Sequence, residues 1–161
     1  SVTLLSVDVF PQGYAGVVSF MKDFHKSALV IDIGSWTVDI LPINEFVPDQ
    51  TRCKSLPLGT ITCMNEINEA LRQNLGQEAD ETTIKEVMIY GTSDIPSEYL
   101  NIRALNFNSD LTQFIFIGGG ATMINHFLPE EDKKNALILD DVSINAKGYE
   151  GLIRHKMGGK S

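Results

Sequence analysis

Apolar and polar positions along this chain follow two patterns, and these predict short buried strands joined by amphipathic helices. A continuous apolar run covers residues 28–33, interrupted only by Asp32, and is typical of a strand buried on both faces. Further strands are predicted over residues 2–9, 37–43, 114–117 and 136–139. A short strand over residues 53–56 is one further option.

Helices are predicted where apolar residues recur three and four positions apart. The clearest covers residues 60–75, and Gly76 is suited to end it. Other helices are predicted over residues 14–25, 82–90, 96–105, 121–127 and 143–154. Adjacent strands followed by alternating strands and helices predict an α/β fold, in which an antiparallel strand group joins a mostly parallel, mixed sheet.

Composition narrows the class of protein. The 161 residues, 43% of them hydrophobic, are enough for one domain, or for one domain and a piece of another. The net charge is −8 and no basic cluster is present, so we expect no direct contact with nucleic acid. No apolar run approaches the roughly 18 residues of a membrane span, so we expect no membrane insertion. Cys53 and Cys63 lack neighbouring metal ligands and are expected to be reduced thiols of a cytoplasmic protein.

The first motif with chemical content is LVIDIGSWTVDI, residues 29–40. Asp32 lies near the end of a predicted buried strand, where a carboxylate is costly unless it is paired, hydrated or near a metal. Gly34 allows backbone N–H groups to approach a ligand closely, so this turn could hold a phosphate while Asp32 orders a hydrated magnesium ion. The alternative is an ordinary β-hairpin with an aspartate that caps the turn.

The second motif is FIFIGGGATMI, residues 114–124. A strand, three glycines and a helix form an arrangement that favours anions at the helix start. Met123 stands where a dinucleotide fingerprint needs its last glycine, and no Gly-Lys-Ser/Thr follows, so neither common phosphate-binding fingerprint is met. The alternative is a glycine turn that serves only tight packing of strand against helix.

Together, in this order and about 85 residues apart, the two motifs resemble the second phosphate motif and the adenosine motif of the actin, sugar-kinase and heat-shock chaperone ATPase superfamily. Within it the chain is most similar to the plasmid-segregation actins of the ParM (StbA) type. Residues 7–16 resemble their strand-to-hinge-helix segment, and residues 142–152 resemble their C-terminal Asn-Ala-x-Gly helix. The resemblance implies a ribonuclease-H-like domain that uses ATP and Mg²⁺.

The resemblance also implies roles for individual residues. Asp32 matches the aspartate that organises magnesium through water and orders the attacking water. Gln12 matches a polar residue near that water, although it could equally be a turn residue that starts a helix. The positions that match the phosphate loop are Gly34, Ser35 and Thr37, and those that match the adenosine turn are Gly118, Gly119 and Gly120. The sequence departs from the family at Ser35 and Trp36, which replace a pair of smaller residues.

Members of this superfamily bind ATP between two related domains, and the first opens with an Asp-x-Gly phosphate loop. Nothing here matches that first loop, since Asp32-Ile33-Gly34 belongs to the second phosphate motif. We therefore expect residues 1–26 to be the last strand and crossing helix of a missing first domain. Residues 27–161 are expected to form the second domain, with a helical insert at about 73–101. On this interpretation the chain alone carries half of the active site.

By resemblance, the intact protein is expected to hydrolyse ATP and to polymerise into filaments that segregate a plasmid or another DNA element. Its partners would be further copies of itself and a DNA-binding adaptor. One alternative is a superfamily member that forms no filament, such as a sugar or acetate kinase. Another is a weakly catalytic actin-like scaffold, for which the altered turn at Ser35 and Trp36 leaves room.

Overall fold

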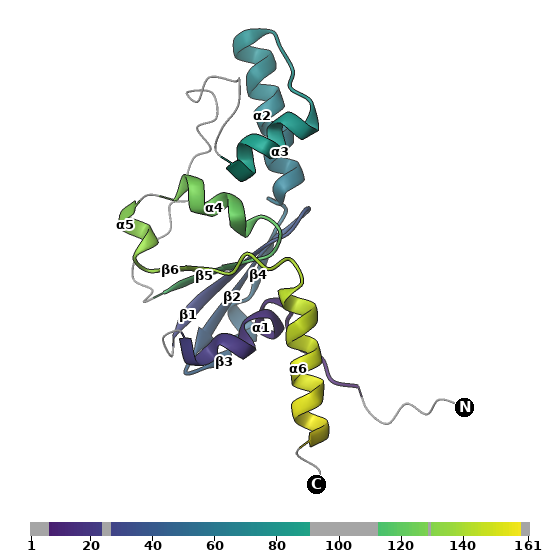
Figure 1. The fold of residues 1–161 in the computed structure, drawn as a ribbon, viewed down its shortest axis with the longest axis vertical. Helices are drawn as coiled ribbons and strands as arrows, with labels where there is room; N and C mark the ends of the chain where they lie inside the picture. The colour runs from purple at the N-terminus through teal and green to yellow at the C-terminus, as the bar shows by residue number, and fades with distance from the viewer. Residues whose placement is uncertain (1–6, 24–26, 91–112, 129, 159–161) are drawn as a thin grey trace, which may run out of the picture.

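A computed structural model describes residues 7–23, 27–90, 113–128 and 130–158 (Figure 1). Its strands are β1 (Ala28–Ile33), β2 (Val38–Asn44), β3 (Val47–Pro48), β4 (Lys54–Leu56), β5 (Phe114–Ile117) and β6 (Ala136–Ile138). Its α-helices are α1 (Gln12–Val17), α2 (Thr60–Leu75), α3 (Glu81–Tyr90), α4 (Ala121–Phe127), α5 (Glu130–Lys133) and α6 (Ile144–Gly158). Two 3₁₀ helices, η1 (Val18–Asp23) and η2 (Gln50–Arg52), complete the described elements.

The strands form one mixed sheet in the order β3–β2–β1–β5–β6, and β4 also pairs with β2. β1 is antiparallel to β2 and parallel to β5, which is parallel to β6. Parallel neighbours need long connections, and helices supply them here: α2 and α3 lie between β1 and β5 in the chain, and α4 and α5 between β5 and β6. The predicted α/β class and ribonuclease-H-like mixed sheet are confirmed, as is the optional strand near residues 53–56.

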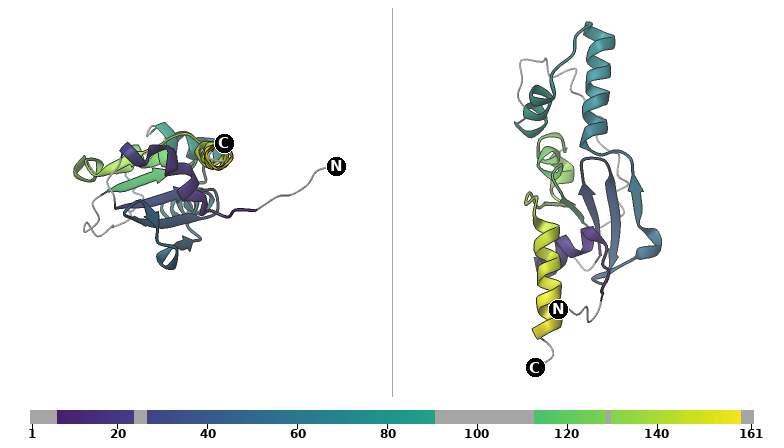
Figure 2. Two further views of the ribbon diagram at one scale, coloured as in Figure 1. Left: turned by 90° about the horizontal axis from the view of Figure 1, so that it is seen from below. Right: turned by 90° about the vertical axis from the view of Figure 1, so that its right-hand side faces the viewer.

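The two faces of the sheet bury different helices because successive strand residues point to opposite sides. On one face, Ala28 and Val30 of β1 belong to a hydrophobic cluster that includes Val17 of α1 and Ile144 of α6. On the other face, Leu29, Ile31 and Ile33 pack with residues of β5 and α4. Asp32 follows Ala28 and Val30 at every second position of β1, so it belongs to the same face of the sheet. Helices α1 and α6 cover this face and lie side by side (Figure 2).

Helices α2 and α3 pack together beyond one end of the sheet, and Met123 of α4 packs against them (Figure 1). Their buried residues are Met64, Ile67 and Leu71 of α2 and Ile84, Val87 and Met88 of α3. α2 has the bounds that the apolar spacing predicts, and it ends at Gly76, which is left-handed with φ 65° and donates its N–H to the Arg72 carbonyl. The part of the expected insert beyond Tyr90 lies outside the described residues.

Other expectations need adjustment. Val7 and Val9 are exposed and belong to no strand, while the rest of the strand predicted over residues 2–9 lies outside the described residues. A strand is stable only with a neighbour to accept its backbone hydrogen bonds, and the described sheet offers none to this segment. The helix predicted over residues 14–25 starts at Gln12 and becomes 3₁₀ from Val18. The helix predicted over residues 96–105 lies outside the described residues, and α5 was not predicted.

Candidate functional site

The centre of the candidate site is the carboxylate of Asp32, which is 5% exposed near the end of β1. Its Oδ2 accepts a hydrogen bond of 2.9 Å from Nδ2 of Asn145, in the first turn of α6. Burial raises the pKa of Asp32, and the nearby Asp39 raises it further, whereas the hydrogen bond from Asn145 lowers it; the net effect is a raised pKa. A carboxylate with this burial and one protein donor is well suited to a cation or its hydration water.

Asp39 lies directly opposite Asp32 on the neighbouring strand, so the two side chains emerge on the same face of the sheet. Its Oδ2 accepts a hydrogen bond of 3.2 Å from the Thr37 hydroxyl. The hydroxyl of Thr37, one of the predicted phosphate-loop positions, is therefore engaged with a carboxylate in this structure. The two aspartates make this corner of the sheet negatively charged, which favours a cation there.

The turn after β1 presents its carbonyl groups to α2. The carbonyls of Gly34 and Ser35 accept hydrogen bonds of 3.0 Å from the backbone N–H groups of Thr60 and Ile61. The Trp36 carbonyl accepts one from Gly59 at 3.2 Å. These bonds satisfy N–H groups at the start of α2, which otherwise lack partners within the helix. Within the described part of the chain, the backbone N–H groups of Ser35 and Trp36 have no acceptor. They are available to an anion.

The three glycines after β5 have different roles. Gly118 has φ +87°, and a side chain there would collide with Oδ1 of Asp32 and the Ile33 carbonyl. A side chain at Gly120 would collide with Ile33, and its N–H donates to the Ile33 carbonyl at 2.9 Å. Gly119 is exposed, and a Cβ there would meet nothing within 4 Å. Tight packing therefore explains Gly118 and Gly120, whereas Gly119 faces open space.

Gln12 and the cysteines lie apart from this arrangement. Gln12 is the first residue of α1, its side chain is exposed, and it makes no hydrogen bond to Asp32.

Cys53 is exposed and Cys63 half-buried, both as free thiols. Burial raises the pKa of each thiol, and nearby carboxylates raise it further. In the described residues, every helix is too short or too polar to cross a membrane.

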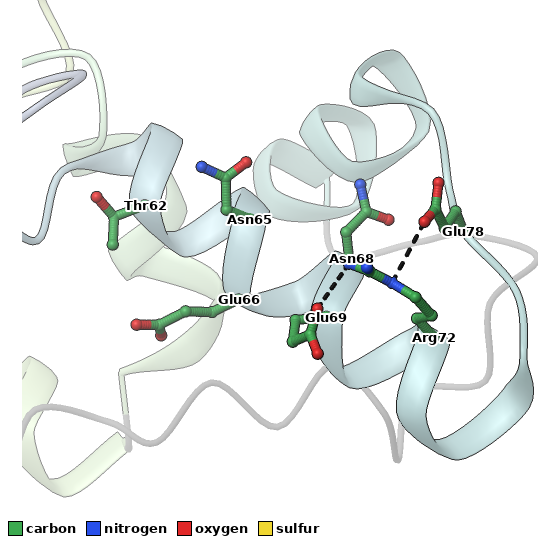
Figure 3. A pocket seen from close by; sticks show the side chains of 7 residues that line it. All are labelled: Thr62, Asn65, Glu66, Asn68, Glu69, Arg72 and Glu78. Atoms are coloured by element: carbon green, nitrogen blue, oxygen red, sulfur yellow. Dashed lines mark ion pairs between the residues drawn. The ribbon is translucent and has the colours of Figure 1, made fainter.

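The hollows of the described surface lie elsewhere. One, of about 510 Å³, lies along α2 and is lined by Thr62, Asn65, Glu66, Asn68, Glu69, Arg72 and Glu78 (Figure 3). Its arginine pairs with Glu69 at 2.6 Å and with Glu78 at 3.3 Å, so these charges are already matched (Figure 3). Another, of about 450 Å³, lies among α3, α4 and β6. Neither is lined by Asp32 or the turn that follows it.

Asp32, the turn over residues 34–36 and Gly118 thus meet at the carboxyl ends of β1 and β5, as the two motifs predict. Asn145 was missed as a site residue, although it lies in the Asn-Ala-x-Gly segment already recognised. The sequence feature that could have identified Asn145 is its position next to the apolar Ile144, on a helix face that packs inward. The role of Gln12 stays a prediction.

The mixed sheet with helices on both faces has the fold of actin-like proteins, as comparison with solved structures shows. Solved structures with the same fold include Ta0583, an archaeal actin homologue also crystallised with ADP, at 22% sequence identity and a TM-score of 0.65. They also include a filament of Alp12 (16%, TM-score 0.64) and a non-polymerisable mutant of pCBH ParM (21%, TM-score 0.60).

The match to Ta0583 covers 91% of this chain and 55% of that protein. The Alp12 and ParM matches each cover 91% of this chain and 53% and 54% of those proteins. The chain therefore spans about half the length of the structures it matches, and at these identities the likeness concerns the fold alone. No protein-family model and no curated protein sequence matches the chain.

Proposed function

We propose that this chain forms the magnesium- and phosphate-binding wall of an actin-like ATPase. The observation that carries the proposal is the combination of a buried Asp32 with a following turn whose N–H groups at Ser35 and Trp36 have no acceptor among the residues that the structure describes. Anions bind well to such consecutive backbone N–H groups. Mg²⁺ is usually held by one or two carboxylates, by phosphate oxygens and by water, and this corner offers carboxylates in that number.

Each residue has a definable role in this proposal. Asp32 would accept hydrogen bonds from water bound to Mg²⁺, with Asp39 adding negative charge. Ser35 and Trp36, in the turn that Gly34 and Thr37 close with a backbone hydrogen bond, would donate their N–H groups to phosphate oxygens. When bound, Mg²⁺ neutralises charge on the phosphates during phosphoryl transfer. Gly119 would leave room for the adenosine side of the nucleotide, and Gln12 would orient the attacking water.

The opposite wall of the site is proposed to come from a first domain, to which α1 forms the crossing helix. Support comes from the packing of α1 against α6 on the Asp32 face of the sheet, and from the coverage of about half of each matched structure. ATP hydrolysis would then be a property of both domains together, with residues 27–161 as the second domain.

We further propose that the intact protein assembles into filaments and segregates a plasmid or another DNA element. The fold is that of Alp12, solved as a filament, and of a ParM, and these likenesses support self-association. The net charge of −8 disfavours direct contact with DNA, so a DNA-binding adaptor would connect the filament to its cargo.

The test is light scattering, with phosphate release followed in parallel, on the intact protein after addition of ATP and Mg²⁺. Scattering that rises and then decays as ATP is consumed supports a segregating filament. Hydrolysis without scattering supports a kinase of the same superfamily. The absence of both supports a scaffold, which the bulky Trp36 in the phosphate turn would suit. Asp32→Ala is the control, and unchanged hydrolysis in that variant would refute the role of Asp32.

A further inference from the structure

The amide of Asn145 connects two parts of the molecule that are 113 residues apart in sequence. Nδ2 donates to Oδ2 of Asp32 at 2.9 Å, whereas the buried Oδ1 has no hydrogen-bond partner among the described residues. A buried acceptor without a donor costs free energy, and an apolar side chain at this position would avoid that cost. The presence of an amide at position 145 therefore indicates that its N–H donor is needed for the hydrogen bond to Asp32.

The surroundings hold this amide in place. A side chain at Gly16 of α1 would collide with Oδ1 of Asn145, so α1 closes one side of the amide. The neighbouring Ile144 is 3% exposed within the core, and Gly148, one turn further along α6, lies against the Ala15 backbone. The position of the Asn145 donor relative to Asp32 therefore depends on how closely α6 packs against α1.

We propose that Asn145 is a positioning residue: it fixes the orientation of the Asp32 carboxylate and makes that orientation depend on the crossing of α1 and α6. With Oδ2 held by Asn145, Oδ1 lies beside Gly118, where no side chain obstructs it. Outer-sphere partners of this kind orient the groups that serve a metal. The orientation of Asp32 by Asn145 does not depend on the proposed function, whereas its consequence for Mg²⁺ rests on that function.

The simpler alternative is that Asn145 only fills space under α1. Asn145→Leu separates the two, because leucine has the same number of side-chain heavy atoms, branched at the same position, and no donor. Ile144→Val is the matched control, since it alters packing at the adjacent buried position of the same helix without touching Asp32.

The first experiment measures the side-chain χ1 of Asp32 in the full chain without nucleotide, from three-bond couplings to its carboxyl carbon in nuclear magnetic resonance. We expect one rotamer in the parent protein and in Ile144→Val, and averaging over rotamers in Asn145→Leu. A single unchanged rotamer in Asn145→Leu, with the fold retained, overturns the proposal. So does averaging in the parent protein, because Asn145 would then not hold the carboxylate.

The second experiment uses the intact protein, which supplies both walls of the proposed site, and measures Mg²⁺ affinity in the presence of ADP. Loss of an outer-sphere partner is expected to weaken it by about 10- to 100-fold in Asn145→Leu, while Ile144→Val stays like the parent. Averaged rotamers with unchanged Mg²⁺ affinity overturn the link to the metal. If the parent protein shows no Mg²⁺-dependent ADP binding, the proposed function fails, and the rotamer measurement still decides the role of Asn145.

Discussion

At the scale of single residues, Asp32 is unusual because it is the one buried polar side chain among the described residues. Since burial raises its pKa in the folded protein, ionised Asp32 lowers stability at neutral pH. The stability it contributes is fully present below the unfolded-state pKa near 3.8 and is lost as pH rises through the folded-state value. The proposed role of Asp32 in holding Mg²⁺ would account for a buried carboxylate at this position.

The substitution Asp32→Asn tests whether the buried charge of Asp32 lowers stability. The neutral amide carries no buried charge, and its oxygen can still accept a hydrogen bond from Asn145. We therefore expect the free energy of unfolding at pH 7 to rise by on the order of 1 kcal/mol. The gain should disappear below about pH 3.8, where the carboxyl is protonated in both states, and Mg²⁺-dependent hydrolysis in the intact protein should be lost. Urea unfolding at both pH values checks the stability, and a less stable variant at pH 7 would contradict the argument.

Gly118 is the second single residue that the fold restricts, because its position accepts only glycine without strain. Gly118→Ala forces a side chain into a left-handed backbone and against Asp32, so we expect a loss of about 1–3 kcal/mol of unfolding free energy. Gly119→Ala is its control for stability, because its Cβ meets open space and should change stability by about 0.5 kcal/mol or less. Equal effects of the two substitutions in thermal unfolding would show that the close contact is not restrictive.

At the scale of elements, the crossing of α1 and α6 depends on Gly148, whose Cβ would collide with the Ala15 backbone. We expect Gly148→Ala to destabilise the protein by about 1–3 kcal/mol, as overpacking does elsewhere. Gly151→Ala, one turn further along α6, meets only Ser19 at 3.8 Å and should gain up to about 1 kcal/mol from helix propensity. Changes of opposite sign in urea unfolding are the expected outcome. A neutral Gly148→Ala would mean that the helices can separate freely.

The start of α6 is held by Asp141, which accepts hydrogen bonds from Lys147 and from the Ser143 hydroxyl and N–H. These bonds, that from Lys147 above all, lower the pKa of Asp141 to about 2. The stability it contributes is therefore present above the unfolded-state pKa of 3.8 and is lost as pH falls towards 2.

We expect Asp141→Asn to lower the melting temperature at pH 7 and to flatten its decline between about pH 4 and pH 2. Asp140→Asn, one residue earlier and exposed, should retain the decline of the parent protein. Melting temperatures measured from pH 2 to pH 7 compare the three proteins. A decline as steep in Asp141→Asn as in the parent would assign the acid sensitivity to other groups.

At the scale of the whole molecule, a ligand that binds only the folded chain must raise its stability. We expect ADP with Mg²⁺, at about 100 times its dissociation constant, to add about 2.7 kcal/mol to the free energy of unfolding. The shift in melting temperature should be absent in Asp32→Ala. A shift of equal size in that variant would place the nucleotide elsewhere on the molecule.

Local sequence was informative about the elements of this fold. The bounds of β1 and β5 follow from continuous apolar runs, because these strands are buried on both faces. The bounds of α2 follow from apolar residues spaced at the helical period, because α2 buries one side. The end of α2 at Gly76 is predictable for a similar reason, since a left-handed cap favours glycine. Val7 and Val9 have the composition of a strand, but composition supplies no pairing partner.

What the sequence by itself determined is the bounds of β1, β5 and α2 and the chemical character of Asp32 and the glycine turns, since these depend on neighbouring residues. Only the tertiary structure decided which glycines pack closely and which faces open space, and only it brought Asn145 to Asp32. Such contacts join positions far apart in the chain, and they exist because β1, α1 and α6 meet on one face of the sheet. A local pattern contains no information about what lies opposite in space.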